Sequence, residues 1–421
     1  MPGGYSQICG HHVQMSDPEG SVLSVGGGGY GPNALAKAGY IFNPATKTWR
    51  RSANDMVNHK WYPTAVSLGG KKILVVGGAG GTSEMEIFDE TTETFSPITG
   101  DNFEFPNLYP GLHILPNNMI FYSRTGFGTA GAGPGGYAYD DDTIQPTWLE
   151  GKRSAYFAFN AGLTGGSWQK IVTSPINRTK GMSVMLASST PPHARILVLG
   201  GADAASNDTY EIIDVSVMSP AATWQPWQTV PDGEHRALPS GVLLPDGKLF
   251  VCGGIQSTNS PCTMYDPQTD SWSPMASLPS IRDYHSVALL LPSGKVMMAG
   301  WYNTKIEVFS PPYLFKGTRP KITNAPNLVH HGATFTIDCP QAASIAKVVF
   351  VRPIAVTHQT DSEQRVIELL PKIFDPAQPG KLTLTAPDGG HPHPMAPRGH
   401  YMMFAIDNGG VPSEARWVYL H

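Results

Sequence analysis

The sequence predicts an all-β fold in which a β-propeller is followed by a small β-sandwich. Glycine and proline are abundant, at 46 and 38 of 421 residues, while only 15% of residues are charged. That composition is typical of short strands joined by tight turns. In addition, a strand-pair unit recurs along the first three quarters of the chain, and a different alternating pattern replaces it beyond about residue 318.

The repeating unit is an apolar strand, a turn, a second apolar strand ending in glycines, a loop, and an aromatic residue followed by Asp or Asn. Five clear copies and one degraded copy cover residues 20–49, 71–95, 194–224, 247–272, 294–311 and, for the degraded one, 108–126. The glycines permit positive φ after the second strand, and the Asp/Asn-Pro-x-Thr pieces form outer turns. A spacing of roughly 45 to 55 residues with four strands per unit is typical of kelch-type blades. We therefore predict a kelch-type β-propeller over residues 1–317, with six blades readable in the chain.

Residues 318–421 contain short alternating segments such as "KVVFVR", "KLTLTAP" and "YMMFAI" without the blade signature. Alternation of this kind predicts strands with one buried face. We expect a small β-sandwich of the immunoglobulin-like type over this range.

Charge and cysteine usage exclude several classes of protein. The formal net charge is -4 and no basic run occurs, which argues against nucleic acid or an anionic membrane as a partner. The N-terminus "MPGGYSQICGHH" has neither the charged nor the apolar region of a signal peptide. The four cysteines lack zinc-type C-x2-C spacing. Cys252 and Cys262 flank one expected hairpin, so a local disulfide between them is one possibility.

Three chemically versatile side chains occupy nearly the same place in their own blades, just before the first strand. Tyr284, Tyr62 and Cys9 each precede the glycine that ends their hairpin by about 15 to 17 residues, and innermost strands of a propeller converge at one mouth of its axis. His285 directly follows Tyr284. Singly, such residues are more often packed aromatics or small hydrophobes. Together, a thiol, two phenols and an imidazole suit copper(II), which favours N and O donors in tetragonal geometry.

On these motifs the chain resembles, along its whole length, the galactose oxidase and glyoxal oxidase family of copper radical oxidases. Tyr284-His285-Ser286 followed by "LLLPSGKV" is similar to the family's Tyr-His pair. "HKWYPTAV" places Tyr62 at the tyrosine that is cross-linked to a cysteine, and "QICGHH" places Cys9 at that cysteine. "VTHQTDSEQR" resembles the segment that supplies the second histidine, here His358.

The resemblance implies an enzyme with a copper ion and a self-processed Cys-Tyr thioether radical cofactor. Cys9 and Tyr62 would form the thioether. Tyr62, Tyr284, His285 and His358 would hold copper, with one position open for substrate and Tyr284 as the general base. The reaction implied is oxidation of primary alcohols or small aldehydes by O2, giving aldehyde or acid plus hydrogen peroxide. A secreted, monomeric protein without nucleic-acid or membrane partners is implied as well.

One further residue carries a possible role. Arg236 stands 17 residues before Gly253. In the fifth blade it is therefore the counterpart of Cys9, Tyr62 and Tyr284, and it could orient a substrate oxygen or form a structural salt bridge.

Two departures from the family shape the expectation. Gly80 and Gly81 stand near the place of the tryptophan that shields the thioether in galactose oxidases, with Trp61 and Trp168 as alternative shields. This favours a glyoxal-type over a galactose-type substrate. The family propeller has seven blades, so this one either has six or belongs to a truncated chain. Two functions remain as alternatives to an active oxidase. One is a non-catalytic kelch interaction or glycan-binding module, and the other is an inactive truncated oxidase.

Overall fold

The protein is described by a computed structural model. The structure describes residues 9–27, 37–77, 85–100, 108–115, 119–126, 152–171, 173–187, 194–201, 208–217, 219, 221–254, 260–300, 303–370, 372–387 and 396–421. Gly80 and Gly81 lie outside the described residues.

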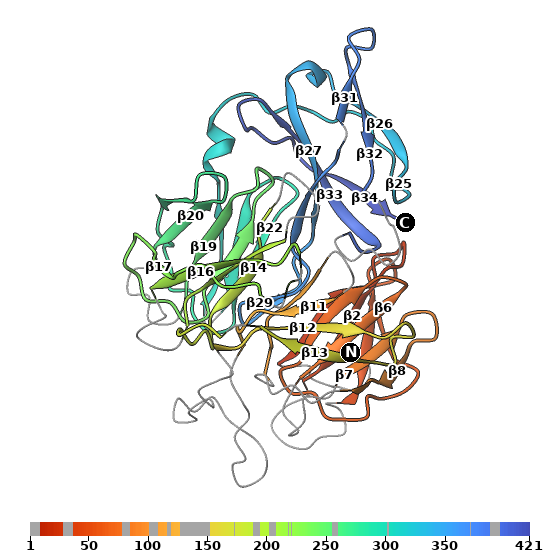
Figure 1. The fold of residues 1–421 in the computed structure, drawn as a ribbon. Coiled ribbons are helices and arrows are strands. Elements are labelled where there is room, and N and C mark those ends of the chain that lie inside the picture. Colours follow the sequence, from red (N-terminus) through yellow and green to blue (C-terminus); the bar gives the residue numbers. More distant parts are fainter. Residues whose placement is uncertain are drawn as a thin grey trace.

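The first three sheets follow the repeat predicted from the sequence (Figure 1). The first contains β1 (Gly10–Gln14), β2 (Val22–Gly26), β3 (Gly39–Asn43) and β4 (Thr48–Arg51). The second contains β5 (Thr64–Leu68), β6 (Lys72–Val76), β7 (Met85–Asp89) and β8 (Thr94–Pro97). The third contains β10 (Leu112–Ile114), β11 (Ile120–Tyr122), β12 (Ala155–Phe159) and β13 (Gly165–Lys170), with β9 (Thr99–Gly100) added in parallel beside β13.

Three more sheets complete the part of the propeller that the structure describes. The fourth contains β14 (Met182–Met185), β15 (Arg195–Leu199), β16 (Thr209–Asp214) and β17 (Gln228–Thr229). The fifth contains β18 (Ser240–Leu243), β19 (Leu249–Cys252), β20 (Cys262–Asp266) and β21 (Ser271–Met275). The sixth contains β22 (Ser286–Leu290), β23 (Val296–Gly300) and β24 (Asn303–Phe309). The six sheets confirm the predicted kelch-type propeller.

The first strand of each sheet lies innermost. β1 packs beside β5, β5 beside β10, β14 beside β18 and β18 beside β22. Neighbouring blades cover both faces of β5, and all five of its residues are buried.

The glycines that end the second strands allow neighbouring blades to approach closely. At Gly26, with φ 69°, a Cβ atom would lie 2.2 Å from the carbonyl oxygen of Lys60, just before the first strand of the next blade. At Gly253, with φ 66°, it would lie 2.6 Å from the carbonyl oxygen of Arg282. The recurrent glycines are therefore required by contact between blades as well as by backbone conformation.

The C-terminal region is the predicted β-sandwich. One sheet has the order β25-β34-β33-β27-β30 and the other β26-β32-β31. The strands are β25 (Leu328–Val329), β26 (Thr334–Asp338), β27 (Ile345–Arg352), β30 (Arg365–Glu368), β31 (Lys372–Phe374), β32 (Lys381–Thr385), β33 (Gly399–Asp407) and β34 (Arg416–Leu420), with 3-10 turns η4 (Pro312–Phe315) and η5 (Ala342–Ser344). Buried Phe350, Tyr401 and Leu382 belong to the core of this sandwich.

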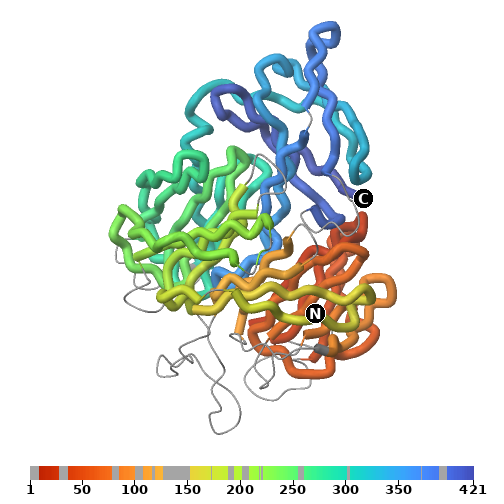
Figure 2. The backbone as a smooth tube through the Cα atoms, in the orientation of Figure 1, coloured from red at the N-terminus to blue at the C-terminus, as the bar shows by residue number. Residues whose placement is uncertain are grey.

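The sandwich sends one hairpin into the propeller. It consists of β28 (Val356–Thr357) and β29 (Thr360–Asp361). β28 contacts both β1 and β22, the innermost strands of the first and sixth sheets, and β29 contacts β14. In the tube view the blue C-terminal chain accordingly runs between the red-orange and green parts of the propeller (Figure 2).

No helix among the described residues is long and apolar enough to cross a membrane. All four cysteines are described and none forms a disulfide. Cys252 and Cys262 are nevertheless directly paired between β19 and β20, so the suggested local bridge is absent although the two residues are neighbours.

Candidate metal centre

The site is built on a backbone feature that every blade repeats. Before or at the start of each first strand, one non-glycine residue has a positive φ between 45° and 67°. These residues are Cys9, Tyr62, Tyr109, Lys180, Leu238 and His285, one for each sheet. Because equivalent positions of the innermost strands converge, the six residues surround one end of the axis.

Backbone hydrogen bonds connect several of these residues across blades. The N–H of Tyr62 donates to the carbonyl of Cys9 at 3.1 Å, and the N–H of Tyr109 donates to the carbonyl of Tyr62 at 2.6 Å. Leu238 donates in the same way to Lys180 at 2.6 Å. The left-handed conformation is thus fixed by contacts between blades, which offset its intrinsic cost of about 1–3 kcal/mol per residue.

Donor atoms from distant parts of the chain meet at this end of the axis. The Sγ of Cys9 and one ring nitrogen each of His285 and His358 lie within 4.8 Å of one another. The hydroxyls of Tyr62 and Tyr284 form a hydrogen bond with each other. Cys9 is half-buried, His285 exposed and His358 buried, so the cluster is closed on the hairpin side and open to solvent near His285.

The rings of the same residues are packed against one another. The His358 ring centroid lies 4.4 Å from that of His285, 4.9 Å from that of Tyr284 and 5.0 Å from that of Tyr62. Tyr284 and His285 are themselves 3.8 Å apart. The structure therefore brings together Cys9 and the four residues that the sequence analysis proposed as metal ligands.

His358 reaches the site because it stands at the tip of the hairpin. His358 and Gln359 form a two-residue turn between β28 and β29, with φ of 48° and 64°. Positive φ at both central residues is typical of a type I′ hairpin turn, which normally favours Asn and Gly. A histidine at this strained place indicates that its side chain is needed there. Its Nδ1 is 2.7 Å from the Thr357 hydroxyl, so Nε2 is the nitrogen that would hold a metal.

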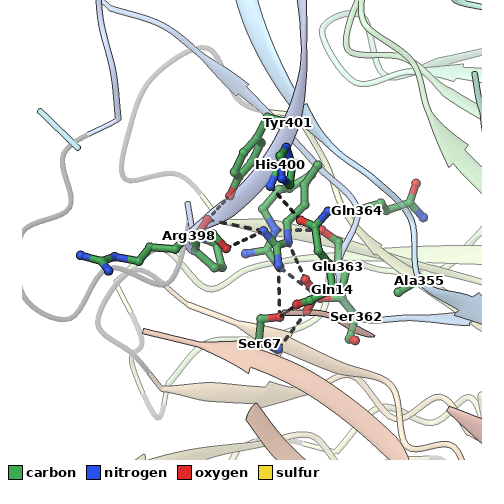
Figure 3. Close-up of polar contacts among 12 residues, drawn as sticks. Gln14, Ser67, Ala355, Ser362, Glu363, Gln364, Arg398, His400 and Tyr401 are labelled. Carbon is green, nitrogen blue, oxygen red and sulfur yellow. Dashed lines mark hydrogen bonds and ion pairs between the residues drawn. The ribbon is translucent and has the colours of Figure 1, made fainter. Parts of the chain in front are cut away.

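Buried polar contacts anchor the hairpin to the propeller (Figure 3). One carboxylate oxygen of Glu363 accepts a hydrogen bond from the backbone N–H of Ser67 at 2.9 Å, and the other accepts from Arg352 Nε at 2.5 Å. Arg352 also donates to the Ser67 hydroxyl at 3.1 Å. The amide of Gln364 bonds both Gly241 and Leu243 in β18, at 3.0 and 2.9 Å. The hairpin is therefore tied to two separate blades.

Burial sets the protonation of the candidate ligands. Desolvation, with the nearby His285 and His11, lowers the pKa of His358 well below its usual value, so this imidazole is neutral and able to bind a metal. Desolvation, the neighbouring Tyr284 and contact with Cys9 raise the pKa of Tyr62 well above the usual range. A bound cation would reverse that preference by stabilising the phenolate.

Two aromatic side chains stack on Tyr62. The Trp61 ring lies 5.2 Å away at an angle of 12°, and the Tyr109 ring lies 4.6 Å away at 16°. Of the two tryptophans considered as shields, Trp61 is therefore the one at the site. Trp168 packs against Phe157 in a different core, at 5.1 Å. Tyr109 was missed, although it precedes a strand in the degraded repeat "LYPGLHILP".

The substrate role considered for Arg236 does not agree with the structure. Arg236 is fully buried and forms two hydrogen bonds to the carboxylate of Asp232, at 2.9 and 3.0 Å. The residue of this blade with left-handed backbone is Leu238, two positions later. Arg236 instead corresponds to Lys60, which stands two positions before Tyr62 and is also a buried cation paired with an acid, Glu86. It therefore stabilises the start of the blade.

The donor set fits copper. Two imidazoles, two phenols and a thiol in a half-buried cluster match the nitrogen, oxygen and sulfur ligands used by copper sites. Lys180 and Leu238, on the opposite side of the ring, offer no comparable ligands. The potential ligands thus occupy one side of the axis.

Comparisons with known proteins agree with this geometry. The family model "Galactose oxidase-like, Early set domain" matches residues 319–420, and "Kelch motif" matches residues 236–279. Aldehyde oxidase GLOX from Vitis pseudoreticulata is 29% identical over 96% of this chain and 80% of its own length. These matches support the galactose oxidase and glyoxal oxidase family of copper radical oxidases, which the sequence motifs resemble. Galactose oxidase from Gibberella zeae is 24% identical over 96% of this chain.

The fold of the chain is shared with a solved structure. A fungal alcohol oxidase determined in complex with copper matches with a TM-score of 0.77 and 23% identity, covering 99% of this chain and 86% of the other. The chain spans 59% of the length of the Gibberella zeae galactose oxidase. The kelch propeller followed by the galactose oxidase-like domain is confirmed by these matches.

Proposed function

We propose that this protein is a copper radical oxidase that oxidises primary alcohols or small aldehydes with O2, giving an aldehyde or acid and hydrogen peroxide. The observation that carries the proposal is the convergence of Cys9, His285 and His358 within 4.8 Å, beside the hydrogen-bonded hydroxyls of Tyr62 and Tyr284. A purely structural propeller mouth or a binding module has no need for this donor set.

Tyr62, Tyr284, His285 and His358 would hold copper. Bound copper would polarise the substrate oxygen and accept one of the two electrons that the substrate loses. Because His285 is exposed while His358 is buried, substrate would approach from the His285 side. The neutral His358 and its hydrogen bond with Thr357 fix one ligand in place before a metal binds.

Cys9 and Tyr62 would be joined by a thioether bond. The support is that Cys9 packs against Tyr62 and accepts a hydrogen bond from its backbone N–H at 3.1 Å. The S–H bond of Cys9 and one ring C–H bond of Tyr62 break and an S–C bond forms. The two hydrogen atoms and their electrons reduce one O2 to hydrogen peroxide. The sulfur then extends the π system of the ring and makes the phenol easier to oxidise.

Tyr284 and Tyr62 would act on the substrate in different steps, Tyr284 as general base and Tyr62 as the acceptor of a hydrogen atom. The Tyr284 oxygen takes the proton of the substrate hydroxyl as general base. The oxidised Tyr62 takes a hydrogen atom from the neighbouring carbon. The two phenols are suited to consecutive steps because their hydroxyls are adjacent, so one bound substrate can reach both.

Small aldehydes and simple primary alcohols are the substrates we propose. The support is the sequence around Tyr62, "WYPT", which is similar to the glyoxal oxidase branch, and the relative named aldehyde oxidase. Trp61 stacks on Tyr62, where it would narrow the access to the ring. An extracellular location and a monomeric state are also proposed, on the family resemblance alone.

Peroxide release tests the proposed function. Copper-loaded protein is offered glyoxal, methylglyoxal, galactose, benzyl alcohol and glycerol, and hydrogen peroxide is measured. We expect peroxide with at least one small aldehyde and none from His358→Ala. If the wild type binds copper but releases no peroxide with any of the five, the oxidase proposal fails and an interaction or glycan-binding propeller takes its place.

A further inference from the structure

Tyr109 contacts Tyr62, Gly10 next to Cys9, and the hairpin that carries His358. We infer that Tyr109 is a positioning residue: it holds Cys9 against Tyr62 so that the thioether can form, and it covers the Tyr62 ring afterwards. The part of the inference that concerns the thioether rests on the proposed function, because only an oxidase of this family would use that bond. The part that concerns the placement of Cys9 applies to the protein before any metal is bound.

The backbone and hydroxyl of Tyr109 hold the two partners together. Its N–H donates to the carbonyl of Tyr62 at 2.6 Å, and its hydroxyl donates to the carbonyl of Gly10 at 3.0 Å. Since Gly10 follows Cys9 directly, the hydroxyl fixes the peptide next to the thiol. Tyr62 in turn donates its N–H to the carbonyl of Cys9. The three contacts join three blades around the Cys9–Tyr62 pair.

The ring of Tyr109 lies against the aromatic part of the site. It stacks on Tyr62 with centroids 4.6 Å apart and an angle of 16°, and it lies 4.8 Å from His358. The residue is completely buried, so its face of the Tyr62 ring is shielded from water. Offset stacking of this kind contributes about 0.5–1.5 kcal/mol beyond area burial.

The hairpin is the third contact. The Thr360 hydroxyl donates to the carbonyl of Tyr109 at 3.2 Å. One residue thus connects the segment that follows Cys9, the Tyr62 ring and the hairpin, which come from different parts of the chain. A change at Tyr109 is therefore expected to disturb the relative placement of Cys9 and Tyr62 more than it disturbs the blade itself.

A packing role alone does not explain a tyrosine here. Its φ is 45°, a conformation in which glycine or asparagine is less strained. A hydroxyl without a function in a fully buried place would need a partner merely to offset desolvation. One partner of the hydroxyl is the carbonyl of Gly10, the residue that follows Cys9, and this bond ties the hydroxyl to the segment that carries the thiol.

Two variants separate the hydroxyl from the ring. Tyr109→Phe removes the hydrogen bond to Gly10 and keeps the stack, whereas Tyr109→Leu removes both. Tyr156→Phe is the matched control, since Tyr156 is also completely buried in the third sheet and its hydroxyl has no hydrogen-bond partner in the structure. Thermal unfolding and circular dichroism first establish that each variant folds.

The first readout needs no copper. Copper-free protein is treated with iodoacetamide and the alkylation of Cys9 is followed by peptide mass spectrometry. We expect Cys9 to react about threefold to tenfold faster in Tyr109→Phe, the effect of one buried hydrogen bond, and faster still in Tyr109→Leu. Equal rates in wild type, both Tyr109 variants and Tyr156→Phe would overturn the inference.

The second readout is the cross-link itself. Copper and O2 are added, and the loss of two hydrogen atoms from the Cys9–Tyr62 peptides is measured over time. Slower cross-linking in Tyr109→Phe than in Tyr156→Phe supports the inference, and equal rates contradict it. If the wild type never cross-links, the proposed function fails, while the alkylation rates still decide whether Tyr109 places Cys9.

Discussion

Replacing Glu363 by glutamine should loosen the hairpin that delivers His358. Glu363 and Arg352 are both fully buried, and their ion pair is 2.5 Å long. Glutamine keeps the shape but leaves the Arg352 charge facing a neutral amide. Removing one partner of a buried pair is expected to lower the free energy of unfolding by about 3–5 kcal/mol. A chain of 421 residues that unfolds as one unit shifts its melting temperature by about 1 °C per kcal/mol, so the melting temperature should fall by roughly 3–5 °C.

The same change should weaken copper binding, although Glu363 is not one of the proposed ligands. Partners that orient a metal ligand typically contribute about 10- to 100-fold in metal affinity. Calorimetric unfolding of the metal-free protein and a copper competition titration measure the two effects. Asp89→Asn is the control because its pair with Lys72 is about 28% exposed, and such surface pairs contribute about 0–1 kcal/mol. A Glu363→Gln protein that melts and binds copper like Asp89→Asn would refute the anchoring role.

Three further variants test the site and its surroundings. Cys9→Ser should remove the gel mobility shift that a Cys9–Tyr62 thioether produces, and a shift that persists would locate the cross-link elsewhere. Trp61→Leu should shorten the lifetime of the oxidised, coloured form by about two- to tenfold, measured by the decay of visible absorption; an unchanged decay would mean that the stack is not protective. Burial raises the pKa of Asp361 to about 6, so folding carries the cost of ionising it above that pH. Asp361→Asn should therefore raise the melting temperature at pH 8 but not near pH 4, where the carboxyl is protonated in the folded state; a gain of the same size at both values would contradict this.

Much of this site could be predicted because the chain repeats itself. Counting back from the blade glycines selected Cys9, Tyr62 and Tyr284, which lie together in the structure. The same counting failed for Arg236, because the blade start contains both a buried cation and, two residues later, a left-handed residue. A count from one glycine cannot tell these two positions apart. The distinction is made by hydrogen bonds between blades, which single-blade patterns do not contain.

Tyr109 and Trp61 show the same limit from another side. Tyr109 could not be assigned to the site by its own sequence context, and Trp61 could not be distinguished from Trp168, since an aromatic residue beside a strand is most often part of a core. What distinguishes them is the stack on Tyr62 at 4.6 and 5.2 Å. The Tyr109 contact depends on how two blades are placed relative to each other, and the Trp61 contact depends on the backbone conformation at Tyr62; local patterns carry no information on either.

The six residues with left-handed backbone, one before the first strand of each sheet, explain how a repetitive propeller can have a metal site on one side only. Each blade requires the unusual backbone, and it is adopted by Leu238 and Lys180 as well as by Cys9 and Tyr62. The conformation is therefore a property of the propeller, whereas the chemistry is a property of the side chain at each position. Because the six left-handed residues stand just before the innermost strands, exchanging one of their side chains is expected to change the site without altering the blade. The hairpin then adds His358, a candidate donor that the described parts of the blades do not supply, and contacts from Glu363 and Gln364 attach this segment to two blades.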